Sequence, residues 1–109
     1  MPTTYKVLGQ SAPTANTATT LYTVPAATST VCSSMTICNS SGANANVSVQ
    51  VAVANAASSQ SQFIVNNNNL ISGDTLFLTL GVTLAATDTV RVTASGANVA
   101  FQIFGSEIS

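Results

Sequence analysis

The two cysteines are the first residues whose spacing bears on chemistry. Cys32 and Cys38 are six residues apart, in a segment that predicts a β-strand. An even spacing places both thiols on one face of a continuous strand, but about 20 Å apart at 3.3 Å per residue. A disulfide requires Cα atoms within about 7 Å, and a structural zinc ion requires more Cys or His ligands than this chain has. We therefore expect two small, buried, free thiols, as suits a reducing cytoplasm.

The carboxylates offer little acid–base chemistry. Asp74, Asp88 and Glu107 are the only three, and there is no His. A glycosidase needs two carboxyl groups across a cleft, and a calcium ion would be thinly supplied with oxygen ligands. Asp74 follows Ser-Gly and Asp88 precedes a strand pattern, so both are typical of turns in which the side chain accepts a backbone N–H. Glu107 lies near the end of the chain, where a tail role is expected. With no His and three carboxylates in turns or the tail, we expect no catalytic residue, no metal, no cofactor and no enzymatic activity.

The two cationic residues, Lys6 and Arg91, are too few for a nucleic-acid site, which needs a basic stripe to displace counterions. Ion pairs at the surface or between subunits are the expected roles, with Glu107 or Asp88 as partners. Among the aromatic residues, Tyr5 and Phe104 lie near the two ends of the chain and are candidate interface anchors. The sequence thus predicts four interface residues, which are Tyr5, Lys6, Arg91 and Phe104.

A run of amides, Asn66, Asn67, Asn68 and Asn69, has two interpretations. Asn tolerates the left-handed backbone region and is typical of loops, which predicts a loop here. Amide side chains also hydrogen-bond sugar hydroxyls, which predicts a glycan- or partner-binding tip together with the loop at residues 40–46. A glycan array, with Asn67→Ala as the variant, separates the two.

The elements that must position these residues are β-strands, because the dominant hydrophobic period is two. Valines alternate with smaller or polar residues over 47–53, and similar alternation covers 76–80, 90–94 and 99–103. Weaker strands are expected at 5–8, 21–24, 31–38 and 63–65. Turn signals separate the runs, so the prediction is an all-β, antiparallel, jelly-roll-like sandwich of seven to nine short strands. The turn at 95–98 is expected to join the last two long strands as a hairpin, and residues 53–57 are expected to form at most one helical turn.

Two segments of the chain resemble each other. Residues 20–31 align without gaps with residues 79–90, and 7 of the 12 positions are identical. A duplicated strand–turn–strand unit and a chance match between Ala/Thr/Val-rich segments both explain the identity. Either explanation predicts strand, turn, strand in both places.

The composition indicates an assembling subunit. Only 5% of residues are charged, and Ser, Thr, Asn and Gln supply 45 of the 109 residues. Sheet edges are normally guarded by Lys, Pro or inward-pointing charge, and this chain has little of these. We expect its edges to be covered by copies of itself or by other subunits. Residues 1–109 are expected to form one domain, with residues 1–19 as an extended N-terminal arm that reaches onto a neighbour. Deleting residues 2–10 should then abolish association with the assembly.

The order of the segments resembles a group of viral proteins. Tyr5-Lys6-Val7-Leu8-Gly9-Gln10 opens the chain, Gly73-Asp74-Thr75-Leu76 and Asp88-Thr89-Val90-Arg91-Val92 follow, and Phe104-Gly105-Ser106-Glu107-Ile108 closes it. Over nearly its whole length, the chain is similar to small proteins of tailed bacteriophages that are encoded among virion structural genes. The resemblance implies a virion structural role without catalytic residues, assembly in the host cytoplasm and location in the virion.

We therefore expect an oligomeric capsid decoration (cement) protein, a trimer first, whose partners are copies of itself and virion proteins such as the major capsid or tail proteins. The start of the chain lacks a basic region followed by an apolar run, as a signal peptide would have. No apolar run approaches the ~20 residues of a membrane span, so neither a membrane nor nucleic acid is an expected partner. The alternatives are a tail, baseplate or fibre component, or a module that binds a host receptor or glycan.

Overall fold

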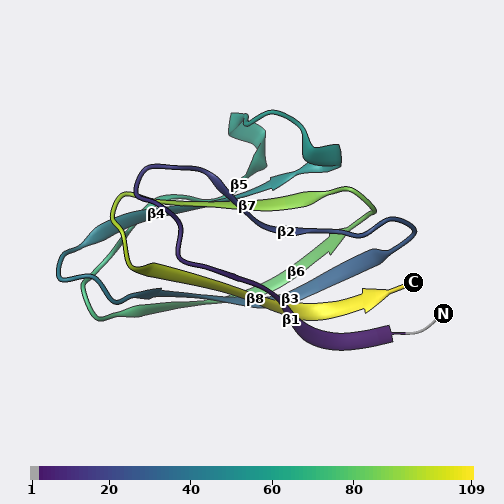
Figure 1. Ribbon diagram of the computed structural model, residues 1–109, viewed down its shortest axis with the longest axis horizontal. Helices are drawn as coiled ribbons and strands as arrows, with labels where there is room; N and C mark the ends of the chain where they lie inside the picture. The colour runs from purple at the N-terminus through teal and green to yellow at the C-terminus, as the bar shows by residue number, and fades with distance from the viewer. Residues whose placement is uncertain (1–2) are drawn as a thin grey trace.

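The computed structural model describes residues 3–109 as two four-stranded antiparallel β-sheets packed face to face (Figure 1). Sheet A has the strand order β1-β8-β3-β6, and sheet B has the order β2-β7-β4-β5. The predicted all-β sandwich is confirmed, with a strand number inside the predicted range. The elements are β1 Thr3–Ser11, β2 Thr19–Thr23, β3 Ser29–Asn39, β4 Ala45–Ala52, β5 Phe63–Leu70, β6 Thr75–Leu84, β7 Thr89–Ala94, β8 Val99–Ile108, and the 3₁₀ turns η1 Val53–Asn55 and η2 Gln60–Gln62.

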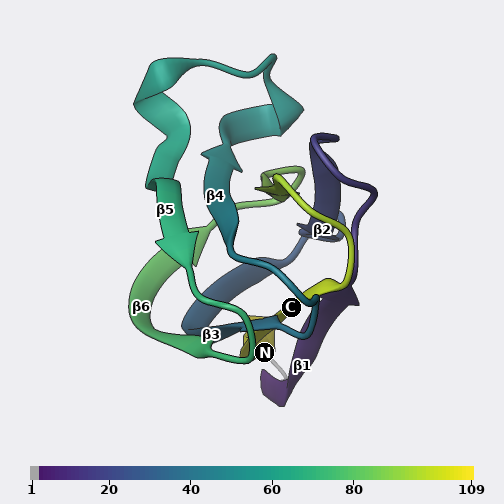
Figure 2. The same cartoon turned by 90° about the vertical axis from the view of Figure 1, so that its left-hand side faces the viewer.

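The strand pairing is that of a jelly roll. Strand β1 pairs with β8, β2 with β7, β3 with β6 and β4 with β5, all antiparallel. The chain is therefore one long hairpin that doubles back between β4 and β5 and is rolled up. The β3–β8 and β4–β7 ladders complete the two sheets. Figure 2 shows the result from one end, with β5 and β6 along one side of the sandwich and β1 and β2 along the other.

The alternating pattern predicts most of the core, and its exception is Val53, which lies beyond the end of β4 and is 69% exposed. Inward-facing residues of both sheets interdigitate, and each large apolar side chain that leaves water contributes about 1.5–3 kcal/mol. The largest fully buried side chains include Phe101, Met35, Ile37, Ile103, Val47, Val49, Val90, Val92 and Val99.

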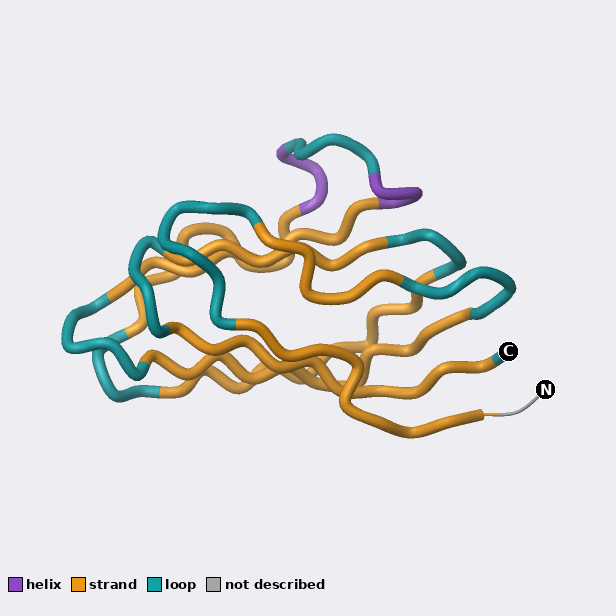
Figure 3. Tube along the Cα trace, in the orientation of Figure 1, coloured by secondary structure: helices purple, strands orange, loops and turns teal. Residues whose placement is uncertain are grey.

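The predicted hairpin at residues 95–98 is wrong. Strand β7 belongs to sheet B and β8 to sheet A, so the turn passes from one sheet to the other. Both edges of β8 are taken by β1 and β3, and both edges of β7 by β2 and β4. A hairpin would therefore displace a better-matched neighbour. Figure 3 shows the loops at the two ends of the sandwich, where such connections join the layers.

The expectation that both cysteines share one face is also wrong. The register of β3 shifts between Cys32 and Ser34 against both of its neighbours. An irregularity of this kind reverses the inward and outward faces beyond it. Cys32 is consequently buried in the core, whereas Cys38 is only half-buried. Both thiols are free, as predicted.

The two similar segments are both strand–turn–strand, and they lie side by side. The first runs from β2 in sheet B to β3 in sheet A, and the second from β6 in sheet A to β7 in sheet B. Their turns are joined by two backbone hydrogen bonds: the Val24 N–H donates to the Asp88 carbonyl (3.0 Å), and the Thr87 N–H donates to the Val24 carbonyl (3.1 Å). Similar sequence thus makes similar sheet-to-sheet crossings at the same end of the sandwich.

The segment between β4 and β5 lies over part of the outer face of sheet B. It holds η1, the single helical turn that the sequence predicts, and η2 (Figure 1). The buried Gln50 side chain donates to the Ser58 hydroxyl (2.7 Å), and Arg91 donates to the Asn55 side-chain carbonyl (2.7 Å). Such bonds fasten the segment, which we call the η1–η2 cover, to sheet B. No helix within residues 3–109 has the length and apolar character needed to cross a membrane.

Nine of the 19 residues of the predicted N-terminal arm form an edge strand of sheet A. Residues 3–11 form β1 and pair with β8 of the same chain, from Thr3 opposite Ile108 to Ser11 opposite Phe101. Residues 1 and 2 of the predicted arm lie outside the described residues. A deletion of residues 2–10 would therefore remove an edge strand as well as any arm. Contact between this segment and a neighbouring subunit stays a prediction.

Candidate interaction site

Sheet A exposes apolar side chains on its outer face. Tyr5 is 83% exposed, Phe77 75% and Val7 48%. The strand neighbours of Phe77, Leu76 and Leu78, pack against the core, so Phe77 itself points outward. An exposed apolar side chain is unremarkable singly, but several on one face mark a candidate contact surface. Phe77 lies across from the polar Thr36 and Gln102, so it stands apart from the others on this face. We call this set, with Phe104 and Val31, the sheet A face.

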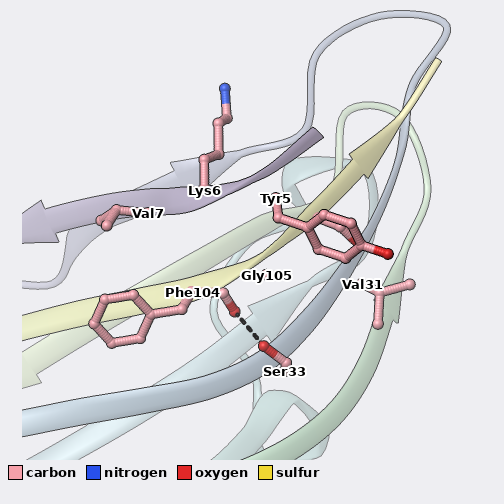
Figure 4. Close-up of a pocket in the computed structure, with 8 residues that line it drawn as sticks. Tyr5, Lys6, Val7, Val31, Ser33, Phe104 and Gly105 are labelled. Atoms are coloured by element: carbon pink, nitrogen blue, oxygen red, sulfur yellow. Dashed lines mark hydrogen bonds between the residues drawn. The ribbon is translucent and has the colours of Figure 1, made fainter. Parts of the chain in front are cut away.

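A shallow groove of about 550 Å³ lies within the sheet A face (Figure 4), at the end where both termini emerge (Figure 1). Tyr5 and Val7 of β1, Phe104 of β8 and Val31 of β3 line it. Figure 4 shows Lys6 directed to the opposite side of β1 from Tyr5. In the floor of the groove, the Ser33 hydroxyl donates to the backbone carbonyl of Phe104 at 3.3 Å. Two predicted interface residues, Tyr5 and Phe104, thus come together in one apolar groove.

Gly105 is required by the close packing of β8 on β3 beneath this groove. A Cβ atom at this position would overlap the backbone carbonyl oxygen of Val31 and press on the Cα atom of Cys32. The absence of a side chain therefore allows β8 to approach β3 closely at this point. The sequence signal that could have indicated this role is the isolated Gly within a strand pattern, which is typical of close backbone approach.

A polar cluster lies on the other side of β1 and β8, between the two sheets. The Lys6 ammonium lies 2.8 Å from the Glu107 carboxylate. The other Glu107 oxygen accepts a hydrogen bond of 2.5 Å from the Tyr22 hydroxyl, which also lies 2.8 Å from the Thr30 hydroxyl. Because Tyr22 belongs to sheet B and the other three residues to sheet A, the cluster ties the sheets together and fastens β1 to β8.

The pKa values follow from these contacts. The hydrogen bond from Lys6, and then that from Tyr22, hold the pKa of the Glu107 carboxyl below its ordinary value of 4.5. Burial, followed by the hydrogen bond to Glu107, raises the pKa of the Tyr22 hydroxyl to about 12. Glu107 is thus ionised and Tyr22 neutral at pH 7, which suits a structural link. The sequence offered Glu107 and Asp88 as ion-pair partners of the two cations without selecting between them, and it gave no sign of Tyr22, which is 85 residues from Glu107.

Arg91, the fourth predicted interface residue, lies apart from this site. It is in β7 of sheet B and bonds to the side chain and backbone carbonyls of Asn55, at 2.7 and 3.2 Å. Asp88, one of the two carboxylates offered as ion-pair partners, instead accepts from the backbone N–H groups of Ala54 (2.9 Å) and Ala85 (3.0 Å). The expected turn role of Asp88 is therefore confirmed, and Arg91 fastens the η1–η2 cover.

Asp74 also acts as a turn residue, since its carboxylate accepts from the backbone N–H of Thr75 at 3.0 Å. Across residues 3–109, no three His, Cys, Asp or Glu side chains gather in a way that could hold a metal ion. Asp74 and Asp88 thus stabilise turns, and Glu107 belongs to the polar cluster.

The prediction of a loop at Asn66–Asn69 is wrong. These residues belong to β5, an edge strand that pairs with β4. A register shift accommodates the turn-forming tendency of Asn: Asn67 has φ 55°, and its backbone N–H donates to the Ser48 hydroxyl at 2.9 Å. The amides therefore sit in a bulged strand. Asn66 and Asn68 line a second shallow groove with Leu76 and Leu78 of β6, and glycan binding by them stays a prediction.

Comparison with known proteins concerns the fold. No protein-family model matches the chain, and no curated protein sequence matches it either. A chain in the structure of infectious bursal disease virus, Gx strain, aligns with 97% of this chain at a TM-score of 0.51 and 8% identity. The present chain spans 30% of that longer chain. The likeness shows a shared sandwich fold, found here in one part of a protein from a virus structure.

Proposed function

We propose that this protein is a structural component of a bacteriophage particle, acting through subunit contacts as a capsid decoration protein. The observation that carries the proposal is the sheet A face. Tyr5 and Phe77 are mostly exposed there, on a chain with only five charged side chains. Apolar surface of this kind gains free energy when a neighbour buries it. The fold likeness to a chain of a virus structure and the resemblance to phage virion proteins support the same role.

The two faces of the sandwich suit opposite environments. The sheet A face exposes apolar side chains, whereas part of sheet B lies under the η1–η2 cover, a segment made largely of Ala, Ser, Gln and Asn. We infer that the sheet A face meets the particle and that the η1–η2 cover faces solvent. This arrangement is what a decoration protein requires, since it must be buried on one side and wetted on the other.

The role is non-enzymatic in this proposal. Glu107 links the two sheets, and Asp74 and Asp88 hold turns, so each carboxylate has a structural use. The partners are copies of the chain and the major capsid protein or tail proteins, met during assembly in the host cytoplasm.

The test is whether the chain stays on purified particles when one face is altered. Tyr5→Asp places a charge in the sheet A face, and Val53→Asp is a matched control because Val53 is 69% exposed but lies in the η1–η2 cover. We expect quantitative mass spectrometry to find the wild type and Val53→Asp on particles, and Tyr5→Asp depleted at least about tenfold. A wild-type copy number near that of the capsid subunit supports decoration, whereas a far lower number favours the tail. Absence of the wild type, or undiminished Tyr5→Asp, contradicts the proposal.

A further inference from the structure

The four edge strands of the sandwich differ in how they are guarded. Proteins protect edges with charged side chains, short length or bulges, because an open edge pairs with other strands. Strand β1 carries Lys6, β2 has only five residues, and β5 has two register shifts. Strand β6 has ten residues, TLFLTLGVTL, with neither charge nor Pro, and its one register shift lies beyond Thr79. It is therefore the least guarded edge within the described chain.

One stretch of β6 is regular enough to template a partner. Thr75 to Thr79 pair without interruption with Cys38 to Ser34 of β3, and the register shifts only beyond Thr79. The centre of this five-residue stretch is Phe77, which is 75% exposed. On the inner side, Leu76 and Leu78 are only half-buried and line the groove between the β6 and β5 edges.

We propose that the free edge of β6 pairs with β6 of a second copy of this chain, antiparallel, about a twofold axis through Phe77. The two A sheets then form one continuous eight-stranded sheet. Phe77 faces Phe77 of the other copy, and Leu76 faces Leu78 in both directions. That subunits pack together is an expectation taken from the proposed function; the strand and the partner are what this inference adds.

The β6 sequence is complementary to itself in this register. With the twofold axis at Phe77, residues on the outer face of one β6 strand lie opposite residues on the outer face of the other. The two Phe77 rings therefore form a cross-strand aromatic pair, which stabilises antiparallel sheets. The leucines meet on the inner side, where the half-buried Leu76 and Leu78 gain cover. A partner strand that carried charges would instead have to desolvate them against this uncharged edge.

The charges nearby are also compatible with self-pairing. Asp74 directly precedes β6 and is the only charged residue among residues 71–84. In the proposed register the two Asp74 residues lie six residue steps apart along the ladder, about 20 Å. This separation exceeds the Debye length of about 8–10 Å in physiological salt, so their repulsion is screened.

The first test is the solution mass of the full chain. Sedimentation or light scattering should give twice the 11.0 kDa chain mass at concentrations where pairing is complete. Phe77→Lys brings two ammonium groups together at the axis and should raise the dimer dissociation constant at least about tenfold. Thr23→Lys, an exposed position on the short edge strand β2, should leave the dimer intact. Because Phe77 is exposed, its replacement should preserve the sheet signal in circular dichroism.

The second test fixes the register by cross-linking. In a Cys38→Ser background, which removes the half-buried native thiol, Phe77→Cys places two thiols opposite each other at the axis, within disulfide range. Thr79→Cys is the matched control, because two such residues lie about 14 Å apart in this register. Mild oxidation should link the Phe77→Cys protein into a covalent dimer and leave the Thr79→Cys protein uncoupled.

The proposal is overturned by a wild type that stays monomeric at millimolar concentration, by a trimer, by a dimer that Phe77→Lys does not weaken, or by equal cross-linking of both cysteine variants. A monomer that pairs only with a different virion protein also overturns it. These outcomes leave the virion role untouched, because that role is tested by the presence of the chain on particles and by Tyr5→Asp.

Discussion

Replacing Tyr22 by Phe removes one hydroxyl group from the polar cluster that joins the two sheets. Tyr22 is 8% exposed and lies beside Thr30, which is fully buried. The hydroxyl contacts Thr30 at 2.8 Å and donates to Glu107 at 2.5 Å. The variant keeps the ring and its packing, so the change in stability reports on the hydrogen bonds alone.

The expected loss follows from the two partners. A hydrogen bond to a charged group contributes about 1.5–3 kcal/mol, and a buried hydroxyl left without a partner costs about 1–3 kcal/mol. Glu107 keeps its ion pair with Lys6, so its charge is not left unpaired. We therefore expect Tyr22→Phe to lower the free energy of unfolding by about 2–4 kcal/mol. For a domain of roughly 100 residues, about 4 °C per kcal/mol makes this a fall in Tm of about 8–16 °C.

Thermal and urea unfolding followed by circular dichroism measure the effect. Tyr5→Phe is the matched control, because Tyr5 is 83% exposed, and surface substitutions of this kind change stability by less than about 0.5 kcal/mol. The cluster would have no part in holding the sheets together if Tyr22→Phe and Tyr5→Phe unfolded at the same temperature and urea concentration.

Three further predictions concern other residues of the same end of the sandwich and of β3. Because the pKa of Glu107 is lowered, its contribution to stability is present above pH 4.5 and is lost as the pH falls through the lowered pKa. Glu107→Gln should therefore flatten the decline of the urea unfolding midpoint below pH 4.5. A decline as steep as that of the wild type would contradict this. Gly105→Ala should cost about 1–3 kcal/mol because its Cβ overlaps a β3 carbonyl, whereas Gly81→Ala, with open space around it, should change thermal stability by less than about 1 kcal/mol. A thiol reagent should label Cys38 in the native protein and Cys32 only after unfolding, since Cys32 is fully buried and burial raises its pKa to about 11; two labels per native chain would be the contrary result.

The strands were predictable because burial on one face imposes a period of two. Val47 and Val49 in β4 and Val99, Phe101 and Ile103 in β8 are all buried, as their alternation indicates. The short turns between the alternating runs predicted an antiparallel sandwich. Which turns are hairpins and which cross between sheets depends on partners far along the chain, and this is why the 95–98 connection was misassigned.

Local irregularities account for the other errors. The even spacing of Cys32 and Cys38 predicted that both lie on one face of the strand. The register shift in β3 lies between them and reverses the faces. Composition placed the four Asn residues in a loop, but a bulge in an edge strand tolerates Asn67 at positive φ equally well. The bulged residues themselves are not Gly or Pro. The glycines at the β3 shift, Gly81 and Gly105, lie on the neighbouring strands β6 and β8, so only the strand pairing reveals their connection with it.

The site was predictable in part. The rarity of charge pointed to Lys6 and Glu107, and position near the chain ends pointed to Tyr5 and Phe104. The jelly roll brings these four together because β1 and β8 pair along their length. The contribution of Tyr22 depends on the packing of sheet B over sheet A, which leaves no local sequence signal.

The most direct measurement of the central claim is an electron-microscopy map of intact particles from infected cells that make this chain. The account predicts density for the two-sheet sandwich on the particle, with Tyr5 and the rest of the sheet A face against a neighbouring subunit and the η1–η2 cover toward solvent. Particles without this sandwich, from cells in which the chain is abundant, would contradict the claim, and so would a sandwich attached through the η1–η2 cover.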